Sequence, residues 1–155
     1  SMLAVQDARS QGYDEALLLN QDGYIAEGSG QNIFIVKDNK IYTNDVNASI
    51  LVGITRNTII EISRDLNYSV KITDLTEEML FNADEAFFTG SATEVTPIAT
   101  VNDKPLGNGK PGKITLELKA LYSRIVHGKE SKYNSWLTFV NNPVTKEEPV
   151  LEESQ

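Results

Sequence analysis

Short strand-like segments joined by tight turns constrain the fold of this chain more than any other feature. An apolar segment at 15–20 is followed by Asp22-Gly23, a pair that favours a hairpin turn into a further extended stretch. Two more segments, 32–36 and 40–43, are rich in β-branched and aromatic residues and are separated by a short polar turn. Because parallel strands need long crossover connections, turns this short predict antiparallel hairpins.

Helical periodicity appears further along the chain. Residues 56–66 place Ile59 and Ile62 on one face, and we expect Thr55 to cap this helix. A second helix is expected over 113–126, where an apolar stripe ends shortly before Gly128. The remaining pattern predicts short elements, namely strands at 70–72, 85–89 and 94–98 and a short helix at 76–83. Hairpins mixed with helices indicate an α+β domain.

Composition narrows the class of function. The 155 residues are 40% hydrophobic and carry a formal charge of -8, with basic residues scattered singly, which argues against nucleic acid and against a basic membrane-binding stretch. The chain has no cysteine and one histidine, so we expect no metal site. We predict a soluble cytoplasmic protein with one folded domain at 1–140 and an acidic, disordered tail at 141–155.

Three loops of small residues stand where predicted strands end, at 27–30, 51–55 and 89–93. Such segments let backbone amides approach an anion closely. In the second loop, amides at a helix start and the Thr55 hydroxyl form a pocket suited to a phosphate. Taken alone, Gly53-Ile54-Thr55 is more typical of an ordinary helix cap.

Together, these loops resemble the signature of the class IV pyridoxal-phosphate aminotransferases in residue type and spacing. The resemblance is carried by E-G-S-G-Q-N-I-F at 27–34, I-Y-T at 41–43 and L-V-G-I-T-R at 51–56. Segments 83–98 and 12–19 are similar to the branched-chain members in particular. The resemblance implies the D-amino-acid-aminotransferase-like fold, with residues 1–140 as the C-terminal, cofactor-binding domain.

The resemblance also implies roles for individual residues toward pyridoxal phosphate. Glu27 matches the carboxylate that faces the pyridine nitrogen and keeps it protonated. Ile54 and Thr55 match positions that hold the phosphate through their amides and the Thr55 hydroxyl. The other matched positions are Ser91, which adds a hydroxyl to the phosphate and borders the substrate, Ala92, whose amide meets the substrate α-carboxylate, and Leu51 and Gly30, which pack near the ring.

The lysine that forms a Schiff base with the cofactor in this family precedes the segment matched by residues 1–13. None of the ten lysines of this chain has the desolvated setting that such a lysine needs. We therefore expect a catalytically incomplete C-terminal fragment, without the catalytic lysine and without the small N-terminal domain of the family.

By resemblance, the parent enzyme transfers an amino group between a branched-chain L-amino acid and 2-oxoglutarate. A D-amino-acid transaminase or an aminodeoxychorismate lyase of the same fold are alternatives, and a non-catalytic binding module is a third. The run at 89–98 favours the branched-chain type. Its partners are then a small amino acid and a 2-oxo acid, and the parent is expected to be a homodimer or a higher homo-oligomer.

Overall fold

The computed structural model describes residues 2–8, 12–26, 31–45, 50–90 and 94–136, and for residues 50–52 it describes the backbone only. The strands are β1 (Met2–Asp7), β2 (Glu15–Leu18), β3 (Asn32–Lys37), β4 (Lys40–Thr43), β5 (Ser69–Ile72), β6 (Glu85–Gly90), β7 (Glu94–Val101) and β8 (Lys104–Pro105). The helices are α1 (Ile50–Asp65), α2 (Glu77–Phe81), α3 (Lys113–Val126) and the 3-10 turn η1 (Ser131–Tyr133). The chain forms two compact units, residues 1–119 and 120–155.

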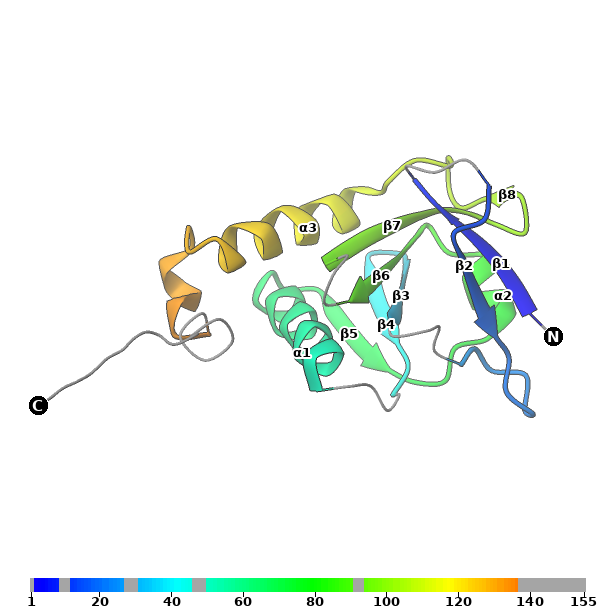
Figure 1. Ribbon diagram of the computed structural model, residues 1–155, viewed down its shortest axis with the longest axis horizontal. Coiled ribbons are helices and arrows are strands. Elements are labelled where there is room, and N and C mark those ends of the chain that lie inside the picture. The colour runs from blue at the N-terminus through cyan, green and yellow to red at the C-terminus, as the bar shows by residue number, and fades with distance from the viewer. Residues whose placement is uncertain (1, 9–11, 27–30, 46–49, 91–93, 137–155) are drawn as a thin grey trace, which may run out of the picture. The chain divides into compact units, whose positions relative to one another are not determined.

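A mixed eight-stranded sheet runs through the first unit in the order β2-β1-β7-β6-β3-β4-β5, with β8 paired to β7 (Figure 1). Neighbouring strands are antiparallel except β4 and β5, which are parallel and are joined through α1. This connection fits the rule that parallel neighbours need a long crossover. The expected α+β fold, a mixed sheet with hairpins and flanking helices, is confirmed.

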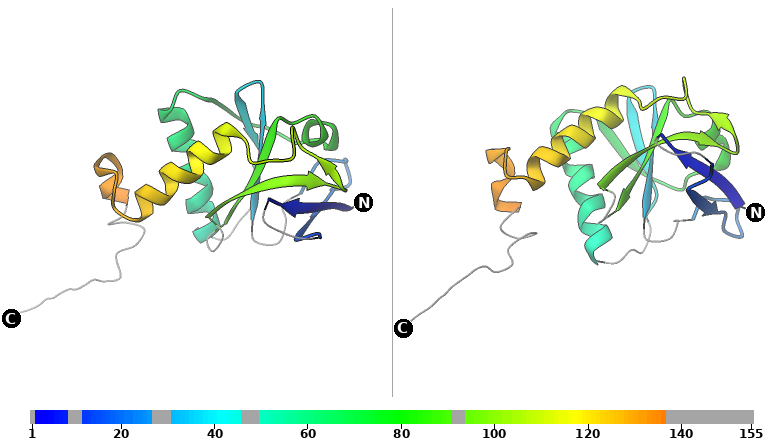
Figure 2. Two further views of the ribbon diagram at one scale, coloured as in Figure 1. Left: turned by 90° about the horizontal axis from the view of Figure 1, so that it is seen from above. Right: turned by 45° about the horizontal axis from the view of Figure 1, so that its top comes forward.

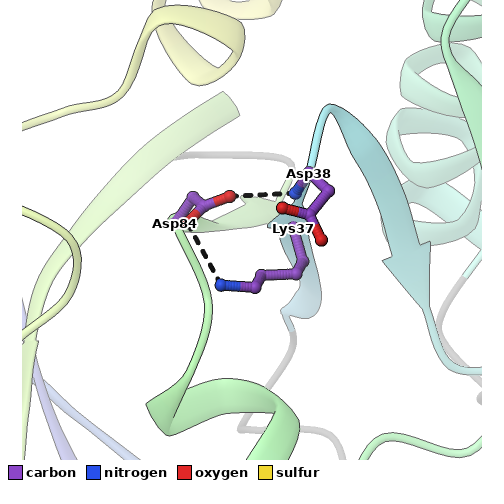
Figure 3. Close-up of polar contacts among 3 residues, drawn as sticks. All are labelled: Lys37, Asp38 and Asp84. Carbon is purple, nitrogen blue, oxygen red and sulfur yellow. Dashed lines mark hydrogen bonds and ion pairs between the residues drawn. The ribbon is translucent and has the colours of Figure 1, made fainter.

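The β3–β4 hairpin was predicted correctly and is fastened at its tip. Asp38 and Asn39 form its two-residue turn with φ values of 51° and 62°, the left-handed conformation that Asp and Asn tolerate best. The Asp84 carboxylate accepts a hydrogen bond from the Asp38 amide at 2.9 Å and pairs with Lys37 Nζ at 3.5 Å (Figure 3). The hairpin tip is therefore held by a residue far away in sequence.

The first predicted hairpin is only partly formed. Strand β2 ends at Leu18, and the return segment makes a single bridge between Leu19 and Ile25. The Asn20 side chain accepts hydrogen bonds from the amides of Asp22 and Tyr24 at 2.9 and 3.0 Å, which shapes a compact turn. Strand β1, for which no element was expected, lies between β2 and β7 with Leu3 and Val5 buried.

The two faces of the sheet carry different partners. One face holds the main apolar cluster, which includes Leu17, Ile33, Ile35 and Phe88 from the strands and Leu80 from α2. Helix α1 packs against β5 and β6, and Figure 2 shows α1 and α2 on opposite sides of the sheet. The sheet thus forms the middle layer of the first unit.

The observed helix boundaries test the predicted helices. Thr76 caps α2 as its N-cap residue, accepting a hydrogen bond from the Met79 amide at 3.1 Å, and α3 spans the predicted residues 113–126. The prediction for α1 is wrong, because this helix begins at Ile50 and Thr55 lies in its second turn. Within the described residues, no helix is long and apolar enough to span a membrane.

In the second unit, Arg124 pairs with Glu130 at 2.8 Å, and the rings of Tyr133 and Trp136 lie 4.6 Å apart.

Candidate functional site

The candidate site lies at one edge of the sheet, where β4 and β6 end and β3 and β7 begin. The register brings these strand ends together, since Asn32 stands opposite Thr89, Phe34 opposite Thr43, and Gly90 opposite Glu94. Segments 27–30, 46–49 and 91–93 lie outside the described residues, and each is joined to a strand end at this edge. The sheet therefore brings together the ends of two loops singled out in the sequence, 27–30 and 89–93, and the strand end that leads toward the third, 51–55, which lies within α1.

A buried polar pair marks this edge on the inner strands. Asn32 of β3 and Thr89 of β6 are both 0% exposed. The Asn32 Oδ1 and Nδ2 atoms and the Thr89 Oγ1 atom have no hydrogen-bond partner in the described part of the chain. Two residues further along both strands, Phe34 and Phe87 stack with ring centroids 5.0 Å apart. The polar pair therefore lies on the same face of the sheet as this aromatic stack, at the end of both strands.

Asn44 and Arg56 form a second polar group at the same edge. Asn44 Nδ2 donates to the Ile25 main-chain oxygen at 3.0 Å, and Arg56 Nη2 donates to the Asn44 main-chain oxygen at 3.0 Å. Within the described residues, Asn44 Oδ1 and Arg56 Nε remain without partners. Buried polar groups are normally paired, so this remaining hydrogen-bonding capacity suits a ligand or another part of the protein.

Arg56 and Lys119 place two cations at this edge, where the carboxylates of Asp45 and Glu94 also lie. Burial lowers the pKa of Arg56, and the Asp45 carboxylate opposes that change, so the guanidinium stays charged at neutral pH. Lys119 of α3 donates through Nζ to the main-chain oxygen of Val95, at the start of β7, at 2.7 Å. Two cations beside unpaired donors favour the binding of an anion.

The predicted site residues fall into two groups. Glu27, Gly30, Ser91 and Ala92 lie outside the described residues, so their predicted roles remain predictions.

The other three, Leu51, Ile54 and Thr55, belong to α1, with Leu51 described by its backbone alone. The Thr55 side chain is buried, and Arg56 is the next residue along the chain. In a helix that begins at Ile50, the amides of Ile54 and Thr55 point at carbonyls of the preceding turn, and the amides without a helical partner lie ahead of Ile54.

Sequence reasoning missed several residues of this site. Asn32 is the last polar residue of the 27–34 motif and Arg56 closes the 51–56 motif, so both could have been found there. Thr89 begins the 89–93 loop and could also have been found there, whereas Lys119 carries no sequence signal, because the path of α3 brings it to this edge.

Comparison with known proteins identifies the family. The model of the family "Amino-transferase class IV" matches residues 1–101, and the chain belongs to this family. The chain is 47% identical over 140 residues to a branched-chain-amino-acid aminotransferase of Pseudomonas aeruginosa, covering 90% of this chain and 45% of the relative. The resemblance seen in the sequence is thereby confirmed, including its branched-chain character.

Solved structures support the same family and fold. A branched-chain amino acid aminotransferase complexed with N-(5'-phosphopyridoxyl)-L-glutamate matches with a TM-score of 0.77 and 45% identity, over 84% of this chain and 43% of that one. The branched-chain aminotransferase of Thermoproteus uzoniensis with norvaline matches with a TM-score of 0.73 and 46% identity, over 81% and 41%. This chain spans less than half the length of these relatives.

Proposed function

We propose that this chain is the cofactor-binding half of a pyridoxal-phosphate enzyme that transfers an amino group between a branched-chain L-amino acid and 2-oxoglutarate. One observation carries the proposal. The five unpartnered buried side-chain atoms of the described residues all belong to Asn32, Asn44, Arg56 and Thr89, at the sheet edge where the three family motifs meet. The names of the related proteins favour the branched-chain type over the D-amino-acid and lyase alternatives.

Pyridoxal phosphate suits the chemistry of this edge, because it combines an anionic phosphate with a polar aromatic ring. Arg56 and Lys119 supply positive charge, and the buried amide and hydroxyl groups supply donors and acceptors. When bound, the cofactor accepts electrons from the substrate α-carbon. The residues of this chain bind it, orient it and hold a proton on its ring nitrogen.

The proposed roles follow the family resemblance. Glu27 holds the proton on the ring nitrogen, and the hydroxyls of Thr55 and Ser91 bind the phosphate. Contact between the phosphate and the amides of Ile54 and Thr55 requires the first turn of α1 to open, because that turn otherwise pairs them within the helix. Gly30 and Leu51 pack near the ring.

The proposal also covers substrate binding, the oligomeric state and the parts of the enzyme that lie outside this chain. The Ala92 amide, beside Ser91, receives the substrate α-carboxylate. The lysine that binds the cofactor covalently and the small domain are contributed by other parts of the parent polypeptide, which works as a homodimer or a higher homo-oligomer in the cytoplasm.

A chimera tests the proposed reaction. This chain replaces the matching 45% of the Pseudomonas aeruginosa relative, and the purified chimera is assayed with leucine and with D-alanine, each with 2-oxoglutarate. We expect glutamate formation with leucine and none with D-alanine. A folded chimera that accepts D-alanine, or that binds cofactor without accepting leucine, would contradict the proposal.

A second experiment tests the expected incompleteness of this chain. The 155-residue chain is incubated with pyridoxal phosphate, treated with borohydride and mapped by mass spectrometry. We expect weak, reversible binding and no stoichiometric adduct, since Lys119 Nζ donates to the Val95 oxygen and Lys37 and Lys40 lie at the hairpin end of β3 and β4. A stoichiometric adduct on one lysine, with transamination of leucine, would overturn this expectation.

A further inference from the structure

Two buried hydrogen bonds connect, through Asn44, the parts of the chain that the proposed function assigns to opposite ends of the cofactor. Asn44 Nδ2 donates to the Ile25 oxygen, and Arg56 Nη2 donates to the Asn44 oxygen, each at 3.0 Å. Ile25 precedes Glu27 by two residues, and Arg56 directly follows Thr55. We call residues 25–26, which lead to Glu27, the carboxylate arm and residues 54–56 the phosphate arm.

Asn44 is itself held firmly by the sheet. The preceding residue, Thr43, ends β4, where its hydroxyl donates to the Ile33 oxygen at 2.7 Å and its main-chain oxygen accepts from the Thr73 amide at 2.9 Å. Both arms are therefore tied to one anchored residue, although 19 residues separate Asn44 from Ile25 and 12 separate it from Arg56.

Because both hydrogen bonds are buried, they fix the positions of the two arms relative to Asn44. Asn44 is 5% exposed and Arg56 is 8% exposed. Breaking either bond would leave a carbonyl oxygen or a guanidinium group buried without its partner, which costs more than the bond contributes when formed. Each arm consequently has one preferred distance from Asn44.

We propose that Asn44 and Arg56 are positioning residues that set the distance between the carboxylate arm and the phosphate arm, and hence the span that the cofactor must bridge. The inference rests on the proposed function for the roles of the two arms. This positioning role is separate from the charge and the unpartnered atoms that the proposed function assigns to the same two residues.

Two probes separate this role from a general effect on folding. Pyridoxal phosphate engages both arms, whereas inorganic phosphate engages only the phosphate arm. Binding of each probe to the 155-residue chain is followed by ¹H–¹⁵N chemical shifts. We expect Asn44→Ala to weaken pyridoxal phosphate binding about tenfold and to change phosphate binding less than about twofold. An equal loss for both probes would overturn the positioning role.

Further variants sharpen the result. Asn44→Asp places an acceptor against the Ile25 oxygen, so it should weaken pyridoxal phosphate binding more than Asn44→Ala does. Arg56→Lys should also act on pyridoxal phosphate selectively, and selective weakening of inorganic phosphate would instead make Arg56 a direct phosphate ligand. Ser63→Ala is the matched control, because Ser63 Oγ donates to the Ile59 oxygen at 2.6 Å, fully buried and two turns along α1.

Amide hydrogen exchange tests the connection without any ligand. Asn44→Ala should speed exchange about tenfold in both arms, at Ile25 and Ala26 and at Ile54 to Arg56, whereas Ser63→Ala should leave Ile25 and Ala26 unchanged. If exchange in the carboxylate arm does not respond to Asn44→Ala, the inference is wrong.

The outcomes for the inference and for the proposed function are distinct. A wild-type chain that binds neither probe, while Asn44→Ala speeds exchange in both arms, would overturn the proposed function and keep the connection. A wild-type chain that binds pyridoxal phosphate, with affinity and exchange unaffected by Asn44→Ala, would keep the function and overturn the connection.

Discussion

The two ends of the central strands differ in whether their polar side chains have partners within the chain. At the hairpin end, where β3 finishes and β6 begins, Asp84 pairs with Lys37 and the Asp38 amide, and Glu85 accepts hydrogen bonds from Ile114 and Thr115 of α3. At the site end, Asn32 and Thr89 of the same two strands have no partner in the described part of the chain. The first end is completed by the chain itself, and the second retains polar capacity for something that binds there.

The largest expected effect concerns Glu85, which caps α3 from a distant strand. Its carboxylate accepts from the amides of Ile114 and Thr115 and from the Thr115 hydroxyl at 3.2, 2.7 and 2.8 Å. Glu85→Ala should lower the free energy of unfolding by about 3 kcal/mol, because charge-assisted bonds at a helix start are lost and donors are left unpaired. Urea denaturation measures this, and Glu61→Ala, which removes only a surface ion pair, should cost less than about 0.5 kcal/mol.

Gly112 lies beside Glu85, and a side chain at this position should destabilise the chain. A Cβ at Gly112 would lie 2.0 Å from Glu85 Cγ and Cδ, so Gly112→Ala must displace the carboxylate and should cost about 2 kcal/mol in denaturation experiments.

Two controls belong to the Gly112 experiment. Gly53→Ala has nothing within 4 Å of its new Cβ and lies inside α1, so it should instead stabilise the chain by about 0.5–1 kcal/mol. In a Glu85→Ala background, the cost of Gly112→Ala should almost vanish, and a full additive cost would refute the steric explanation.

At the site end, removal of a polar group should leave the free energy of unfolding unchanged or raise it. Thr89→Val removes a buried hydroxyl that has no partner in the described residues, so it should leave the stability of the free chain unchanged or raise it by about 1 kcal/mol. Thr115→Val, which removes the hydroxyl bonded to Glu85, should instead cost about 1 kcal/mol. Thermal unfolding of both variants compares the two ends, and equal losses would remove the distinction between them.

The smallest effect is a pH dependence at the hairpin end. The hydrogen bond from Tyr68 to the Glu117 carboxylate raises the pKa of Tyr68 from 10.0 to about 12. A raised folded-state pKa contributes stability that is fully present below pH 10 and is lost as the pH rises toward 12. The effect is small because the hydrogen bond lies at the protein surface, where solvent screens the carboxylate charge.

Tyr68→Phe tests this pH dependence. The stability difference between the wild-type chain and Tyr68→Phe should be constant below pH 10 and shrink above it, as measured by denaturation at a series of pH values. A difference that stays constant up to pH 12 would show that the hydrogen bond does not persist in solution.

Local chemistry determined much of this molecule in advance. The Asp38-Asn39 turn, the Thr76 cap and the bounds of α3 follow from turn propensity, capping and the 3.6-residue period, each of which acts within a few residues. The family can also be identified from the sequence alone, because its motifs and their spacing can be read directly from the residues.

The tertiary structure decided what depends on distant partners. The start of α1 was misplaced because Thr55 is a residue type favoured at an N-cap, and local preference does not reveal that the helix already begins at Ile50. The strand register sets Asn32 opposite Thr89, and the Glu85 carboxylate caps α3. Hydrogen bonds through Asn44 connect Ile25 with Arg56. Each of these contacts joins residues well separated in sequence. Strand register and packing create such contacts, since shifting a strand by one residue would turn each of its side chains to the other face.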